Sequence, residues 1–189
     1  MDTDYTKIST IAELFHDYVF KDNTDYERLE YYLEEAGIEV YYAELDDVDG
    51  YLRINSENGR PRIVIKANQY SPRQRFTMAH ELGHLVLHHK FVPWKEWKRI
   101  KHEEKDAVLE VTMYRGGTYN SEESKKEREA NDFAGAFLMP TRKIGRIIQN
   151  FKEEHGRNIR MSELESRLSN EFKVSVPAAS VRLKRLFNE

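Results

Sequence analysis

Residues 75–88 read RFTMAHELGHLVLH, and residues 80–84 within this stretch form an H-E-x-x-H pattern. On an α-helix, at about 100° per residue, His84 lies about 40° from His80, His88 about 80° and Glu81 about 100°. The opposite face of the same helix carries apolar residues, at Met78, Leu82, Leu85 and Val86. We therefore expect a helix that buries one side in the core and displays imidazoles on the other.

Two imidazoles one helical turn apart can bind one Zn²⁺ ion, and Glu81 beside them can hold a water on that ion. A catalytic zinc site uses three protein ligands and leaves a fourth position for water. The chain has no Cys, so the third ligand must be a His or a carboxylate from elsewhere. The alternative is a solvated helix face, because four of the seven histidines lie between His80 and His89 and this clustering could be chance.

The third ligand is sought in a helix predicted over residues 121–138, which contains Glu127-Arg128-Glu129-Ala130-Asn131. Glu127 and Asn131 are four residues apart and share a helix face. The small Ala130 would let this helix approach the ligand helix closely. Glu127 could then reach the metal, and Asn131 could bond a ligand imidazole. The residues alone equally allow Glu127 to be one more charge of a surface run from Glu122 to Glu129.

The remaining pattern predicts an α+β fold that is mostly helical. Helices are expected over residues 8–19, 25–36, 71–88, 141–156, 162–172 and 177–187, and strands of a small three-stranded sheet over 38–42, 51–54 and 62–66. Ser71 and Thr141 are the predicted N-caps of their helices, and Gln74 completes a capping box with Ser71. We expect a core over residues 1–140 and a C-terminal helical segment over 141–189 that packs on it.

Composition limits the class of protein. A chain of 189 residues makes about one domain with a small appendage, and 11 Tyr, 9 Phe and 2 Trp argue against a disordered chain. No apolar run approaches the roughly 20 residues of a membrane span, and the acidic N-terminus shows no secretory signal, so a cytoplasmic location without membrane contact is expected. The net charge of −3 hides a basic C-terminal segment, since residues 141–189 hold 11 Lys and Arg against 6 Asp and Glu.

Two motifs, Arg75–His88 and Glu127–Ala134 with the following Phe137-Leu138-Met139-Pro140, resemble the ImmA/IrrE family of metallopeptidases. The resemblance extends from about Tyr26 to the C-terminus. It implies a zincin-like core with a gluzincin-like site, in which His80, His84 and Glu127 bind Zn²⁺ and Glu81 is the catalytic base. The family's E-x-x-A-N pattern selects Glu127 over Glu129. It also implies that the C-terminal segment is helix-turn-helix-like.

The same resemblance implies a site-specific zinc endopeptidase that cleaves a helix-turn-helix repressor and so releases genes of a mobile element or a stress response. A second donor to the oxyanion is expected, and Tyr114, Tyr119, Arg115 and His88 are its candidates. Two alternatives lack proteolysis. One is a DNA-binding regulator with Arg182, Lys184 and Arg185 toward phosphate, which we favour less because Leu164, Leu168, Val181, Leu183 and Leu186 need burial. The other is a zinc-binding interaction module.

Overall fold

A mixed sheet carries one long helix on its face in the computed structural model, which describes residues 3–21, 23–55, 59–92, 108–113 and 121–187. The strands are β1 (Glu39–Ala43), β2 (Val48–Ile54), β3 (Pro61–Lys66) and β4 (Val108–Met113), in the order β1-β3-β2-β4. Strand β1 is parallel to β3, and β2 is antiparallel to both β3 and β4. The three predicted strands are confirmed, and β4 joins them from a segment for which no strand was predicted.

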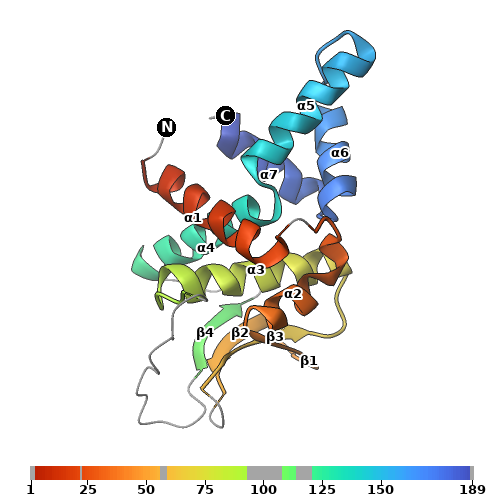
Figure 1. Cartoon of the computed structure of the whole chain (residues 1–189). Coiled ribbons are helices and arrows are strands. Elements are labelled where there is room, and N and C mark those ends of the chain that lie inside the picture. Colours follow the sequence, from red (N-terminus) through yellow and green to blue (C-terminus); the bar gives the residue numbers. More distant parts are fainter. Residues whose placement is uncertain (1–2, 22, 56–58, 93–107, 114–120, 188–189) are drawn as a thin grey trace.

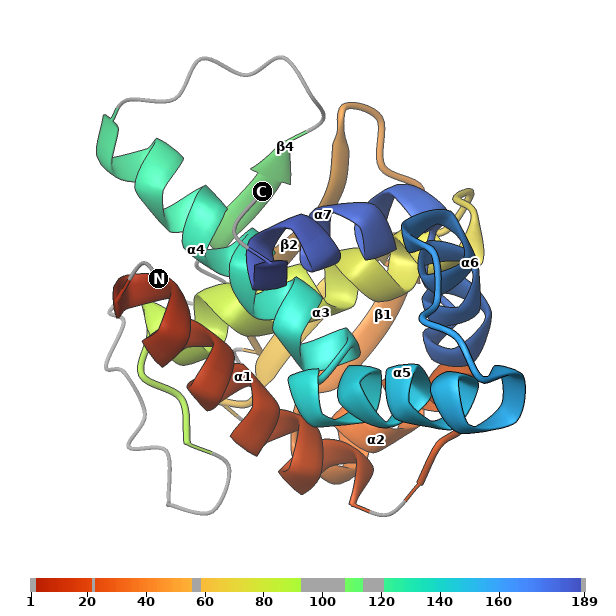
Figure 2. The same cartoon turned by 90° about the horizontal axis from the view of Figure 1, so that it is seen from above.

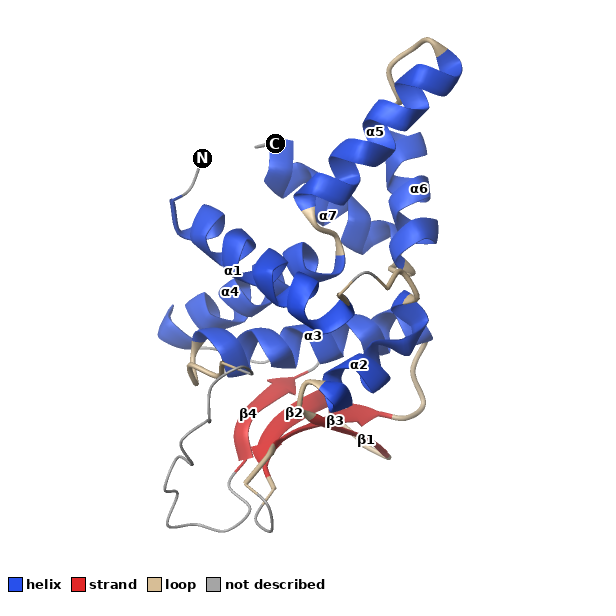
Figure 3. Ribbon diagram, viewed as in Figure 1, coloured by secondary structure: helices blue, strands red, loops and turns tan. Residues whose placement is uncertain are grey.

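Helix α3 (Ser71–Leu87) lies across the sheet and carries the H-E-x-x-H residues (Figures 1 and 3). Its predicted apolar face is confirmed, since Met78, Leu82, Leu85 and Val86 are all buried. The sheet comes very close to the helix at Gly50 of β2, where a Cβ atom would lie 2.8 Å from Cγ2 of Thr77. Glycine at this position therefore lets the helix that carries the site lie directly on the strands.

Most of the remaining helices lie on the side of α3 away from the sheet, and Figure 2 shows them from above. Helix α4 (Ser121–Leu138) packs against α3, and α1 (Thr3–Phe20) packs against α4. A 3-10 turn (Tyr26–Arg28) leads into α2 (Leu29–Glu35), which lies beside α1 and β1. The chain ends in α5 (Thr141–His155), α6 (Met161–Phe172) and α7 (Val176–Phe187). None of the helices within the described ranges combines the length and apolar composition needed to cross a membrane.

Two predicted N-caps are wrong, since α3 has Tyr70 and α5 has Pro140 at the N-cap position. Helix α3 has Tyr70 as its N-cap, and Gln74 donates through Nε2 to the carbonyls of Lys66 and Ala67 at the end of β3. Helix α5 begins at Thr141, whose backbone N–H and hydroxyl both donate to the Glu13 carboxylate of α1, at 3.0 Å and 2.6 Å. A long-range contact with Glu13 therefore replaces local capping at α5, whereas at α3 the Gln74 side chain ties the first turn of the helix to the end of β3.

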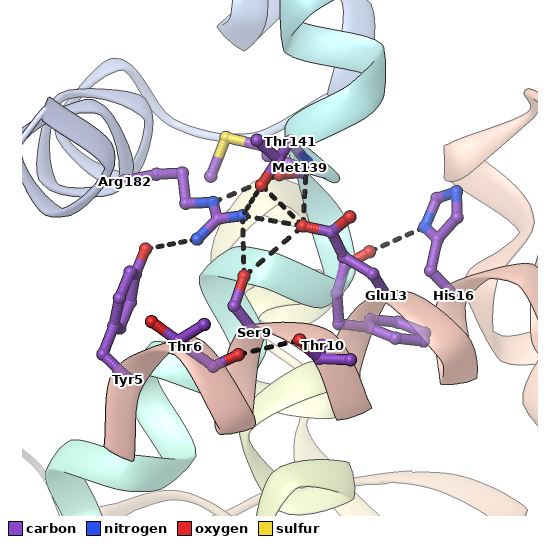
Figure 4. Close-up of polar contacts among 10 residues, drawn as sticks. Tyr5, Thr6, Ser9, Thr10, Glu13, His16, Met139, Thr141 and Arg182 are labelled. Atoms are coloured by element: carbon purple, nitrogen blue, oxygen red, sulfur yellow. Dashed lines mark hydrogen bonds and ion pairs between the residues drawn. The ribbon is translucent and has the colours of Figure 1, made fainter. Parts of the chain in front are cut away.

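Helix α7 is fixed to α1 by the buried side chain of Arg182 (Figure 4). Its guanidinium donates to the Tyr5 hydroxyl, to Ser9, Glu13 and Thr141 at 3.0–3.3 Å, and to the Met139 carbonyl at 3.2 Å. Placing Arg182 toward phosphate was therefore wrong, since the whole guanidinium is taken up inside the protein. Arg185 is half-exposed and pairs with Asp132 of α4 at 3.0 Å. Val181, expected to be buried, is exposed.

Candidate metal centre

The polar face of α3 is buried rather than displayed to solvent. The exposed fractions of His80, Glu81 and His84 are 3%, 0% and 1%. Helix α4 covers this face, because Gly83 of α3 has no side chain and meets Ala130 of α4 there. A Cβ atom on Gly83 would lie 3.1 Å from both Cα and the carbonyl oxygen of Ala130. The small residues at this contact bring α4 within reach of the imidazoles, as the sequence predicted for Ala130.

Glu127 completes a compact group of three donor atoms with His80 and His84. The two Nε2 atoms lie 3.0 Å apart, Oε2 of Glu127 lies 3.3 Å from Nε2 of His80, and Oε1 lies 3.2 Å from Nε2 of His84. Other glutamates belong to the same α4 surface run, yet Glu127 is the one placed at the imidazole pair. These three side chains form a group that could hold a metal ion.

The spacing and chemistry of these donors fit a zinc ion. Ligands about 2.0–2.1 Å from a tetrahedral Zn²⁺ lie about 3.3 Å from one another, close to the three separations found here. The donor set also fits, because Nδ1 of His80 lies 3.1 Å from Oδ1 of Asn131, an atom that can only accept a hydrogen bond. Nδ1 therefore carries the proton, and for a neutral ring the lone pair of Nε2 points at the Glu127 carboxylate. Two such acceptors face each other favourably only with a proton or a metal cation between them.

The pKa values of His80 and Glu127 also show that this site favours positive charge. Burial lowers the pKa of His80, but the hydrogen bond to Glu127 and the nearby negative charges of Glu81 and Glu127 outweigh it, so the pKa is raised overall. Burial raises the pKa of Glu127, and its hydrogen bonds from His80 and His84 outweigh that effect and lower it to about 2. The site thus keeps its carboxylate ionised and attracts a cation.

Asn131 occupies the position predicted for it, one turn beyond Glu127 and in contact with the ring of His80. Such a contact fixes which imidazole nitrogen can bind a metal and how the ring is turned. Of the proposed oxyanion donors, Tyr114, Tyr119 and Arg115 lie outside the described residues. His88 is among the described residues, and its ring contacts His84 and Glu129.

His88 and Glu129 form a polar chain that sequence reasoning missed. Nδ1 of His84 lies 3.0 Å from Nδ1 of His88, and Nε2 of His88 lies 3.1 Å from Oε2 of Glu129. The sequence had indicated only an oxyanion candidate at His88 and no ligand at Glu129. The available signal was the spacing, since His88 follows His84 at the same four-residue interval that separates His84 from His80.

A helix with H-E-x-x-H that lies on a mixed sheet, with a carboxylate from the next helix, is the arrangement of a metallopeptidase-type fold. The family model described as Peptidase_M78, IrrE N-terminal-like domain, matches residues 33–94 and 99–184. The chain belongs to this family, and the resemblance inferred from its two motifs is confirmed.

A solved structure of a Mycobacterium tuberculosis transcriptional regulator has a similar fold, with a TM-score of 0.57 and 16% sequence identity. The match covers 94% of this chain but 47% of that protein, so this chain spans about half of its length. At this identity the likeness concerns the fold alone. A comparison with curated proteins gives no match.

Proposed function

We propose that the chain is a zinc-dependent endopeptidase that hydrolyses a specific peptide bond in a protein substrate. The observation that carries this proposal is the convergence of His80, His84 and Glu127 within hydrogen-bonding distance, next to the buried carboxylate of Glu81. When bound there, Zn²⁺ would supply a Lewis acid that polarises a carbonyl and lowers the pKa of a coordinated water to about 7. Two neutral imidazoles and one carboxylate would leave the ion one net positive charge.

Glu81 is the residue proposed to move the proton. It follows His80 directly on α3, its carboxylate is fully buried, and its negative charge helps to raise the pKa of His80. In this role Glu81 accepts a proton from the attacking water and passes it to the leaving amine. His80, His84 and Glu127 hold the ion, and Asn131 holds the His80 ring.

The substrate proposed is a helix-turn-helix repressor, and its cleavage would release genes of a mobile element or a stress response. Membership of the family supports this choice, because the resemblance implies a narrow, regulatory protease. The basic surface needed by a DNA-binding alternative is smaller than the sequence indicated. Of the three basic residues assigned to phosphate, Arg182 is buried and Arg185 pairs with Asp132, while Lys184 is exposed.

The test uses the Glu81→Gln variant, which keeps the shape of the side chain and removes the base. The parent and the variant are loaded with Zn²⁺ and incubated with the repressor-like product of a neighbouring gene, and fragments are mapped by mass. We expect equal zinc content and a loss of cleavage of about 10²–10⁴-fold in the variant. Glu171→Gln, a change at an exposed residue of α6, is the matched control and should cleave like the parent.

Equal cleavage by the parent and Glu81→Gln would remove Glu81 from the role of base. Zinc binding without any cleavage of protein substrates would instead favour the interaction module. A salt-dependent shift of duplex DNA with the repressor left intact would favour the DNA-binding regulator. The choice of ligand is tested separately, because Glu127→Ala should lose zinc far more than Glu129→Ala. The reverse order would make Glu129 the ligand.

A further inference from the structure

We infer that His88 and Glu129 are positioning residues that set the tautomer and ring orientation of His84. This inference rests on the metal centre of the proposed function and adds two side chains to it. The three groups form a continuous chain from α3 to α4, with contacts of 3.0 Å from His84 to His88 and 3.1 Å from His88 to Glu129. His88 is the C-cap residue of α3, and its side chain is 10% exposed, so the chain is largely shielded from water.

The direction of the hydrogen bonds follows from the end of this chain. An ionised carboxylate can only accept, so Nε2 of His88 must donate to Glu129. A neutral His88 then has a lone pair on Nδ1, and the Nδ1 atom of His84 must carry the proton that lies between the two rings. Nε2 of His84 is left with its lone pair, and it lies 3.0 Å from Nε2 of His80 and 3.2 Å from Glu127. This chain of hydrogen bonds therefore leaves Nε2 of His84, the nitrogen that would bind a metal, without a proton.

His80 and His84 are held in the same way by different partners. Asn131 accepts from Nδ1 of His80, and His88 accepts from Nδ1 of His84. Glu129 then fixes His88, with Lys125 lying 3.6 Å from the other oxygen of the same carboxylate. Both ligand imidazoles thus have an acceptor on the side away from the metal, which is the arrangement that orients metal-binding histidines. Two neighbouring glutamates of α4 thus have different roles. Glu127 faces the Nε2 atoms of His80 and His84, whereas Glu129 contacts His88, which lies behind the His84 ring.

The test compares His88→Asn with His88→Leu, since the two introduced side chains have nearly the same shape and differ in hydrogen bonding. The asparagine side chain would keep an acceptor close to the position of Nδ1, whereas leucine has none. We expect His88→Leu to weaken Zn²⁺ binding about 10–100-fold in a competition with a chelator. His88→Asn should bind within about threefold of the parent if the acceptor is what matters. Absorption spectra of the Co²⁺-loaded proteins should change for the leucine variant and resemble the parent for the asparagine variant.

Equal losses in the asparagine and leucine variants would overturn the inference, because they would assign the effect to packing. His155→Phe, which removes a distant, half-exposed histidine of α5, controls for changes in overall histidine content and should bind like the parent. Nitrogen-15 NMR of the metal-free parent decides the point without any metal. A His84 ring protonated on Nδ1 supports the proposed chain of hydrogen bonds through His88 to Glu129. A ring protonated on Nε2 alone overturns it. Failure of the parent to bind zinc would refute the proposed function but would leave this tautomer measurement decisive.

Discussion

Adding one methyl group at Gly83 should disturb the contact that brings α4 to the ligand helix. A Cβ atom there would lie 3.1 Å from the backbone of Ala130 and 3.2 Å from Cβ of Phe133, whereas ordinary contacts begin at 3.4 Å. Helix α4 would have to move away by about 0.3 Å, the difference between these distances, because a backbone atom cannot turn aside as a flexible side chain can. Metal sites require ligand distances within about 0.2 Å of their ideal values. The displacement thus exceeds what the site tolerates.

The expected change in stability combines two opposing terms. Replacing glycine by alanine inside a helix favours folding by about 1 kcal/mol. Forcing an extra methyl group into a filled contact costs about 1–3 kcal/mol. Gly83→Ala should therefore leave the free energy of unfolding unchanged or lower it by up to about 2 kcal/mol. Gly145→Ala gives the first term alone, because Gly145 of α5 is exposed and a Cβ atom there would meet nothing within 4 Å.

The assay is thermal unfolding of the metal-free parent and both variants, followed by Zn²⁺ affinity from chelator competition. For a chain of this length, 1 kcal/mol corresponds to about 2–4 °C in the melting temperature. Gly145→Ala should melt about 2–4 °C above the parent and keep its zinc affinity. Gly83→Ala should melt at least about 2 °C below Gly145→Ala and bind zinc more weakly. If Gly83→Ala gains as much as Gly145→Ala and keeps the parent's affinity, α3 and α4 do not approach each other as described.

Three further outcomes are expected. Burial lowers the pKa of His16 to about 4, so between pH 6.5 and 4 the unfolded chain binds a proton that the folded chain does not. The free energy of unfolding should therefore fall by up to about 1.4 kcal/mol per pH unit as the pH is lowered through this range. Urea denaturation at pH 6.5 and 5 should show a smaller loss for His16→Gln than for the parent. An equal loss in the two proteins would exclude His16 as the cause. Arg182→Met should lower the free energy of unfolding by roughly 3 kcal/mol because its buried partners lose their donor. Arg142→Met, which breaks the exposed ion pair with Asp17, should lower it by at most about 1 kcal/mol. Similar losses for the two variants in urea denaturation would contradict the buried network around Arg182. Asn131→Leu should weaken Zn²⁺ binding about 10–100-fold because His80 loses its acceptor, and unchanged chelator competition would show that this hydrogen bond does not support the site.

The grouping of His80 and His84 was predictable from the sequence because their relation is local. The spacing of His80 and His84 places them on one face of any helix, and Met78, Leu82, Leu85 and Val86 mark the opposite face as one that packs in the core. The role of Glu127 was harder to predict, because the helical pattern allowed it equally well to be an exposed charge on the protein surface. The family resemblance selected it, and the structure places its carboxylate at both imidazoles.

The features that sequence reasoning missed depend on partners far away in the chain. His88 meets Glu129 across 41 positions, and Thr141 meets Glu13 across 128. Strand β4 is defined by pairing with β2, which lies more than fifty residues earlier. Local periodicity carries no information on such pairings, because they are decided when the helices and strands pack. For the same reason, an imidazole face that was expected to meet solvent lies beneath α4.

The way the site is shared between α3 and α4 separates its sensitivity from that of the fold. Asn131, Glu127 and Glu129 all reach from α4 to histidines of α3, so one displacement of α4 alters every polar contact of the group at once. The fold has further supports, since α3 also rests on the sheet and α4 also packs against α1 and α7. A change at Gly83 should therefore reduce zinc affinity by a larger factor than its effect on the melting temperature suggests. A change at Arg182, which contacts α1 rather than the ligands, should show the opposite balance.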